Sequence, residues 1–152
     1  METRYNNIYK SARTAAGMTQ ERWAEMIGVS ADSVRKYEGN SCLPSDDVVA
    51  RMAELSGMPV LGYWHLKNKS GVANDLLPDV AQVPLPQAVI QLLSELDDLE
   101  DKKIIPNLLQ IAKDGIIDED ERPQFDSIIK ELNDVIEAAL AVRYAQKGGR
   151  DG

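Results

Sequence analysis

Charged side chains gather on one face of a short helix that the sequence predicts over residues 31–38. Helical spacing places Asp32, Arg35 and Lys36 together on this face and turns Val34 to the opposite side. A guanidinium and an ammonium group donate hydrogen bonds and carry positive charge, so both can bind anionic groups. The side chains of this helix can therefore bind an anionic partner.

Residues that could perform catalysis or hold a metal are scarce. The chain has one cysteine, Cys42, and one histidine, His65, so neither an internal disulfide nor a set of zinc ligands is available. No glycine-rich phosphate loop follows a strand, and no nucleophile has a recognisable base. We expect no enzyme activity, no catalytic residue, no metal and no cofactor.

The elements that must position the charged helix are themselves short helices. The predicted order is a helix over 8–16, one over 20–27, the charged helix, a fourth after Pro44 and Ser45, and a fifth after Pro59. Thr19 and Ser30 are suited to cap the second and third helices, because a hydroxyl accepts from the free N–H groups of a first turn. Neither half of the chain shows the alternating pattern of strands, so the predicted fold class is all-α.

The run from Thr19 to Asn40 closely resembles the helix-turn-helix of the Xre/Cro repressor family. The matching positions are Thr19-Gln20, Trp23-Ala24, Gly28-Val29-Ser30, Val34, Tyr37, Glu38 and Gly39-Asn40. The resemblance covers about residues 6–67 and implies a five-helix, lambda-repressor-like DNA-binding domain. It does not extend to the C-terminal half.

The resemblance also implies a set of residues that contact double-stranded DNA, with the charged helix in the major groove. The implied DNA-binding residues are Thr19, Gln20, Ser30, Ala31, Asp32, Ser33, Arg35, Lys36 and Asn40. Gln20 would fix position on a phosphate, and Arg35 is the best candidate for a bidentate bond to guanine. Lys36 could reach either a base or a phosphate.

Several charged positions have two interpretations. Arg13 and Glu38 stand where the family often places a partly buried ion pair, and exposed helix charges are the alternative. Asp32 is acidic where many relatives carry a neutral polar side chain, so it could accept from cytosine or repel phosphates. Asp46 and Asp47 would face the DNA backbone unfavourably, or they simply favour the start of the fourth helix through its dipole.

The acidic net charge of -8 lies in the second half of the chain. Residues 1–68 carry three Lys and five Arg against eight Asp and Glu, whereas the remainder carries nine basic and 17 acidic residues. Because phosphate neutralisation supplies much of the affinity for DNA, the neutral first part remains compatible with a DNA partner.

The second half is predicted to be a small helical hairpin or bundle. The expected boundaries are a DNA-binding domain over 1–68, a linker over 69–85, a C-terminal oligomerisation or interaction domain over 86–147, and a disordered tail over 148–152. Helices are expected over 86–99, 101–113 and 120–145. Residues 114–121 match part of a calcium-binding loop, but Ala112 stands where that loop needs a ligand, so a turn is predicted instead.

The last predicted helix carries an apolar stripe that must pack against another surface. The stripe consists of Phe125, Ile128, Leu132, Val135, Ala139 and Val142. A homodimer seam is favoured, because related regulators bind paired half-sites about one DNA turn apart. The alternative is a partner within the two preceding helices, and both could hold on different edges of the stripe.

The favoured function is a sequence-specific regulator, a repressor that binds a palindromic operator as a dimer. The alternative is an antitoxin-like or anti-regulator protein whose acidic C-terminal half binds another protein. No stretch approaches the roughly 20 apolar residues of a membrane helix, and the N-terminus lacks a signal-peptide core. We expect a cytoplasmic protein without a membrane partner.

Overall fold

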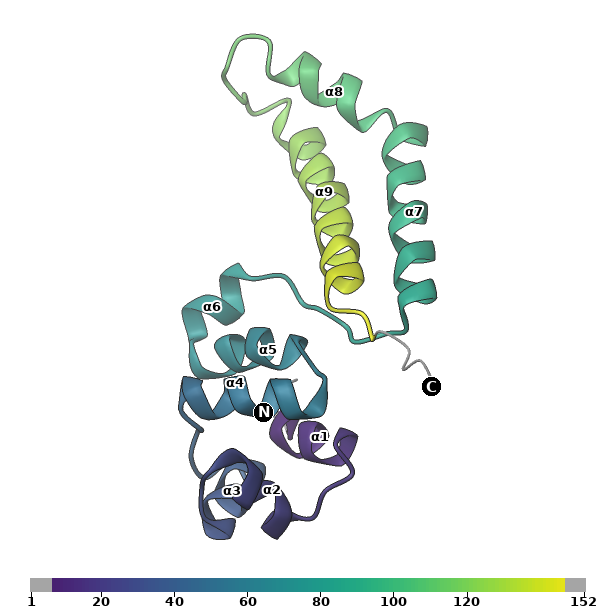
Figure 1. The fold of residues 1–152 in the computed structure, drawn as a ribbon. Helices are drawn as coiled ribbons and strands as arrows, with labels where there is room; N and C mark the ends of the chain where they lie inside the picture. The colour runs from purple at the N-terminus through teal and green to yellow at the C-terminus, as the bar shows by residue number, and fades with distance from the viewer. Residues whose placement is uncertain (1–6, 147–152) are drawn as a thin grey trace. The chain divides into compact units, whose positions relative to one another are not determined.

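A computed structural model describes residues 7–146 of the chain. They fall into two compact units that divide between Leu77 and Pro78, and the predicted tail over 148–152 lies outside the described residues. The helices of the first unit are α1 (Ile8–Ala15), α2 (Gln20–Ile27), α3 (Ala31–Glu38), α4 (Asp46–Ser56), α5 (Val60–Lys69) and α6 (Gly71–Leu76) (Figure 1). The described part of the chain is all-α, as predicted.

Serine and threonine caps set where the helices of the first unit begin. The hydroxyl of Thr19 accepts from the backbone N–H of Arg22 at 3.2 Å, which opens α2. Ser30 and Ser45 make the same bond at the starts of α3 and α4. Each bond satisfies an N–H group that has no partner inside the helix.

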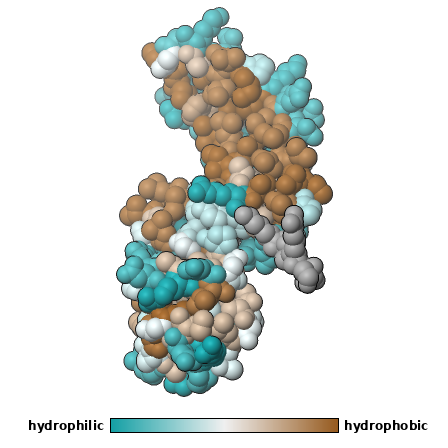
Figure 2. Space-filling view, viewed as in Figure 1, coloured by the Kyte–Doolittle hydropathy of each residue, from teal (hydrophilic) through white to brown (hydrophobic). Residues whose placement is uncertain are grey.

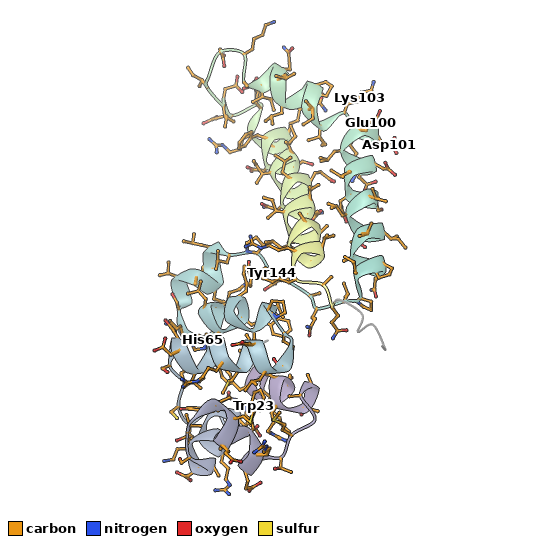
Figure 3. All side chains as sticks on the ribbon, in the orientation of Figure 1. Trp23, His65, Glu100, Asp101, Lys103 and Tyr144 are labelled. Carbon is orange, nitrogen blue, oxygen red and sulfur yellow. The ribbon has the colours of Figure 1, made fainter. Side chains whose placement is uncertain are left out.

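The core of the first unit gathers the apolar faces of α1 to α5. Trp23, Ile27 and Leu61 are fully buried, and Trp64 packs against the same cluster while half-buried. Both tryptophans therefore support the core, and Figure 3 shows Trp23 inside the helices of this unit.

The predicted linker begins inside the first unit. Ser70 accepts from the backbone N–H of Ala73 at 3.1 Å and thereby starts α6 within residues 69–85. The ammonium of Lys67, on α5, donates to the carbonyl of Leu77 at 2.7 Å. This bond ties the end of the unit back to α5, so the unit continues to Leu77 instead of ending at residue 68.

The second unit is a helical hairpin with a short helix across its end. Its helices are α7 (Leu85–Asp101), α8 (Ile104–Ile111) and α9 (Arg122–Arg143). At one end of the hairpin, Ala88 is buried against Ala141. At the other end, Ile104 and Ile128 form a second cluster. Both clusters lie inside the unit. On its outside, Figure 2 shows a broad apolar surface over α7 and α9.

None of the helices in residues 7–146 combines the length and apolar character that crossing a bilayer requires. In the same residues, no group of His, Cys, Asp and Glu has an arrangement that could hold a metal ion.

The acidic segment before α9, which matches part of a calcium-binding loop, forms a turn. Asp118 accepts from the N–H of Glu121 at 2.9 Å, and Glu121 accepts from the N–H of Asp118 at 3.3 Å. This reciprocal pair resembles a capping box and closes the turn over residues 118–121, directly before α9.

Candidate nucleic-acid interface

The turn between α2 and α3 is too short to let the two helices change their angle freely. It consists of residues 28–30, in which Gly28 adopts the left-handed conformation with φ 74°. Glycine takes this conformation without the steric cost that a Cβ imposes. The turn, together with the buried Val34 on the inner side of α3, holds the outer face of α3 toward solvent.

The outer face of α3 carries the three charged residues that the sequence placed there. The side chains of Asp32, Arg35 and Lys36 are 64%, 54% and 56% exposed. They project from the first to the last turn of α3, and a helix of this size fits the major groove of DNA. The geometry therefore leaves their polar groups accessible to a ligand.

Each charged group on this face contacts an opposite charge of the same unit. Lys36 Nζ lies 2.9 Å from Asp32 Oδ2, one helical turn away, and Arg35 Nη2 lies 3.5 Å from Glu21 Oε1 on α2. The hydrogen bond between Lys36 and Asp32 lowers the pKa of Asp32 and raises the pKa of Lys36. Because all four groups are exposed, these pairs are weak and can open when a stronger partner arrives.

The small polar residues of the site lie at the helix starts. Ser33 donates its backbone N–H to Ser30 Oγ at 3.1 Å, and the two hydroxyls lie 2.9 Å apart. Ala31 is half-buried against the core, and Thr19 caps α2. Asn40 follows α3 in the left-handed region with φ 59°. These residues lie beside the charged face. The hydroxyls of Thr19 and Ser30 cap the first turns of α2 and α3.

Glu38 at the end of α3 is the centre of a scaffold network. Arg13 Nε donates to Glu38 Oε1 at 2.5 Å, and the two side chains are only 15% and 7% exposed. Burial opposes ionisation of Glu38, but the bonds from Arg13 and Gln20 outweigh it and lower the pKa of this carboxyl. Arg13 also donates to the carbonyl of Met18 at 2.9 Å. The network joins α1 to both helices of the α2 and α3 pair.

Gln20 belongs to this scaffold network. Its Nε2 donates to Glu38 Oε2 at 2.8 Å, which uses one of the two hydrogens of the amide. The dipole at the start of α2 favours an anion. The Gln20 side chain therefore supports the scaffold, and its contact with a phosphate stays a prediction.

A second polar network links α1, α4 and α5, and no local pattern in the sequence indicates it. His65 Nδ1 lies 2.8 Å from the hydroxyl of Tyr9, and His65 Nε2 lies 3.1 Å from Asp46 Oδ1. Lys69 Nζ lies 2.6 Å from the same oxygen of Asp46. Figure 3 shows His65 within the first unit. Asp46 thus joins α4 to α5 instead of simply standing at the start of a helix.

The apolar stripe of α9 packs largely inside the second unit. Ile128 is 2% exposed, Phe125 and Leu132 pack against its cluster, and Val142 packs against the cluster around Ala88. Val135 is half-buried and Ala139 is exposed. The intramolecular alternative therefore accounts for most of this stripe, while other apolar side chains of α7 and α9 remain uncovered.

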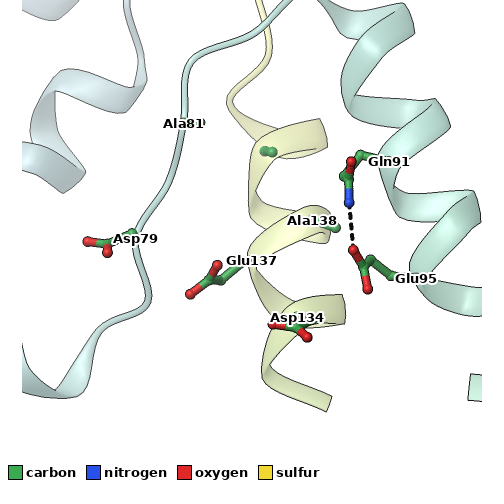
Figure 4. A pocket seen from close by; sticks show the side chains of 8 residues that line it. Asp79, Ala81, Gln91, Glu95, Asp134, Glu137 and Ala138 are labelled. Carbon is green, nitrogen blue, oxygen red and sulfur yellow. Dashed lines mark hydrogen bonds between the residues drawn. The ribbon is translucent and has the colours of Figure 1, made fainter. Parts of the chain in front are cut away.

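A shallow hollow of about 250 Å³ in the second unit has an acidic lining (Figure 4). Glu95, Asp134 and Glu137 border it, and Gln91 donates to Glu95 at 2.5 Å. No basic residue lines it. Its charge would repel phosphates, so the hollow does not extend the candidate interface.

Comparison with known proteins finds a family model that matches part of the first unit. Residues 10–61 match the family model of a helix-turn-helix domain, which spans α1 to the start of α5. The match supports a DNA-binding family of this kind and is not specific to one subfamily. No curated protein and no solved structure matches the chain.

Proposed function

We propose that this protein is a sequence-specific regulator that inserts α3 into the major groove of double-stranded DNA. One observation carries the proposal: Arg35 and Lys36 are exposed on a helix whose angle is set by a short turn and by the buried pair of Arg13 and Glu38. Arg35 would bond guanine in a bidentate manner, which is worth about 1–3 kcal/mol of discrimination. When DNA binds, Lys36 leaves Asp32 and contacts a base or a phosphate.

The regulator acts as a homodimeric repressor on a palindromic operator. A single copy presents few positive groups, because Arg35 and Lys36 both have carboxylate partners in the free protein. Two copies would double the contacts, and two-fold symmetry in the protein matches two half-sites in the DNA. Thr19, Ser30, Ala31, Ser33 and Asn40 border the contact, and the backbone at the start of α2 holds a phosphate. The protein works in the cytoplasm without an enzymatic step.

Selection from a random duplex library, followed by fluorescence anisotropy, tests the DNA-binding proposal. We expect one enriched palindrome, and affinity for it that falls as salt rises. Arg35→Ala should lose most preference for the palindrome over a scrambled duplex. Arg22→Ala is the matched control, since Arg22 is an equally exposed arginine that pairs with Glu25 on α2. Absence of an enriched sequence would contradict the proposal.

A second candidate function is capture of another protein by the acidic second unit, as in antitoxin-like or anti-regulator proteins. The uncovered apolar side chains of α7 and α9 favour it. Under this alternative, DNA binding is weak or absent, and the selection experiment returns no sequence. The two candidates therefore give opposite results in the same measurement.

A further inference from the structure

Among the apolar side chains that the second unit leaves exposed, six lie along α7 and α9 and form a face. Large side chains on this face are 37% to 56% exposed. We call it the α7–α9 face, and it consists of Leu85, Val89, Leu93 and Leu96 of α7 with Ile129 and Ile136 of α9. Figure 2 shows the apolar surface continuing across both helices.

Helical geometry explains why these residues remain uncovered. In α7, Leu85, Val89, Leu93 and Leu96 follow at intervals of four, four and three residues, which keeps them in one stripe. Ala88 lies on the adjacent flank and packs against α9. On α9, Ile129 and Ile136 are seven residues apart and lie beside the flank that Ile128 uses for the core. Each helix has an apolar surface wider than its neighbours in the unit cover.

The size of the α7–α9 face matches one side of a protein interface. Its six side chains expose roughly 500 Å², within the range of about 300–600 Å² for the largest, often functional, apolar patch of a monomer. A standard interface buries about 800 Å² on each partner. The face would bury a comparable area together with the polar residues at its border. An apolar face that extends along both helices of a hairpin also suits a second hairpin, because two hairpins of this kind close into a four-helix bundle.

The charges at the rims indicate which helix packs on which. The second half of α7 carries Glu95, Asp97, Asp98, Glu100 and Asp101, and α7 has no basic residue. Glu100 and Asp101 lie at the end of α7 (Figure 3), and the exposed Arg122 begins α9. Two copies of α7 packed together would bring acidic rows into contact. The helix α9 has three basic residues, Arg122, Lys130 and Arg143, among four acidic ones. Pairing α7 with the α9 of another copy would therefore reduce this repulsion and could set Glu100 against Arg122.

We propose that a second copy of this chain covers the α7–α9 face, with a two-fold axis parallel to the helices. This symmetry places α7 on the partner's α9, running in the opposite direction, and buries Leu93 and Ile136 in the centre of a four-helix bundle. The inference deepens the proposed function, because it identifies the surface that would join two DNA-binding units. The dimer seam thus uses Ile129 and Ile136 with α7, while Ile128 and Val142 serve the core of each unit.

Sedimentation velocity of the full chain over a micromolar concentration series tests the surface without DNA. We expect a dimer for the unaltered protein, and Leu93→Glu or Ile136→Glu should raise the dimer dissociation constant by more than about 100-fold, because each dimer would bury two new carboxylates. Leu76→Glu on α6 is the control, since Leu76 is 76% exposed outside the face and should leave the dimer unchanged. Circular dichroism verifies that each variant is folded.

A charge-reversal cycle tests the pairing of α7 with the partner's α9. Arg122→Glu and Glu100→Arg should each weaken the dimer by about threefold at low salt, and the double variant should recover the original affinity. This pairing would be overturned if the dimer dissociation constant of the double variant rose by the product of the two single effects.

Two results would overturn the proposed dimer surface. One is a monomer for the unaltered protein at all concentrations, which leaves the face to a different protein. The other is a dimer that tolerates both Leu93→Glu and Ile136→Glu. Failure of DNA binding is a separate result, because it appears in the selection experiment and leaves the sedimentation data unchanged.

Discussion

Arg13 and Glu38 are bound to each other across 25 residues of sequence, with Arg13 Nε 2.5 Å from Glu38 Oε1. The bond joins α1 to the last turn of α3, the helix that presents Arg35 and Lys36. Gln20 supplies a further donor to the same carboxylate from the start of α2. The orientation of α3 therefore depends on one nearly buried carboxyl group.

Removal of one partner of this pair should destabilise the first unit strongly. Arg13→Ala leaves Glu38 buried without its main donor, and we expect the free energy of unfolding to fall by about 3 kcal/mol. Urea denaturation measures the change. Arg22→Ala removes an exposed pair with Glu25 and should cost less than about 1 kcal/mol. Equal costs for the two variants would contradict the role of the pair as scaffold.

Two glycines with equally open surroundings should respond in opposite directions to the same substitution. Gly28→Ala places a Cβ on a residue with φ 74°, which costs about 1 kcal/mol of stability although no atom lies within 4 Å. Gly62→Ala also meets no atom within 4 Å, but Gly62 lies inside α5 and should gain about 0.5–1 kcal/mol. Thermal unfolding of both variants measures the difference. A stabilising Gly28→Ala would show that the turn does not require the left-handed conformation.

Stability should fall when the solution is acidified through the titration range of histidine. Burial lowers the pKa of His65 from its ordinary value of 6.5, although Asp46 opposes this shift. With the pKa lower in the folded state, the unfolded chain binds a proton more readily. The stabilising contribution of neutral His65 is present above the unfolded pKa and is lost as the pH falls below it.

The single histidine makes this pH effect testable. We expect the free energy of unfolding to decrease between about pH 7 and pH 5.5, measured by urea denaturation at each pH. In His65→Gln, the decrease over the same interval should be smaller, even though loss of the bonds to Tyr9 and Asp46 lowers stability at every pH. An unchanged slope in this variant would assign the effect to other groups.

Asp32 should restrain binding to DNA of any sequence. Asp32→Asn removes a negative charge from the exposed face of α3 and releases Lys36 from its pair. Affinity for a scrambled duplex at low salt should rise about threefold to tenfold, with a steeper salt dependence. Asp75→Asn, which neutralises an exposed acidic residue on α6, is the control. Altered preference at a cytosine position without a general gain would instead favour a base contact by Asp32.

The local elements of the first unit can be recognised from short sequence signals. Thr19 and Ser30 cap helices through hydroxyls that bond within three residues, and Gly28 ends α2 through its own backbone conformation. Such signals act over one helical turn, so they are visible without knowledge of the fold. Helical spacing likewise showed that Arg35 and Lys36 share the face opposite Val34.

The partners of the side chains on these elements became apparent only from the folded chain. Gln20 was expected at a phosphate, but its amide is bound to Glu38, which lies 18 residues further along the chain. Periodicity showed a broad apolar surface on α9, and packing then took Ile128 into the core and left Ile136 exposed. The physical reason is that helical spacing defines which residues share a face, whereas the choice of partner for that face depends on contacts between distant parts of the chain.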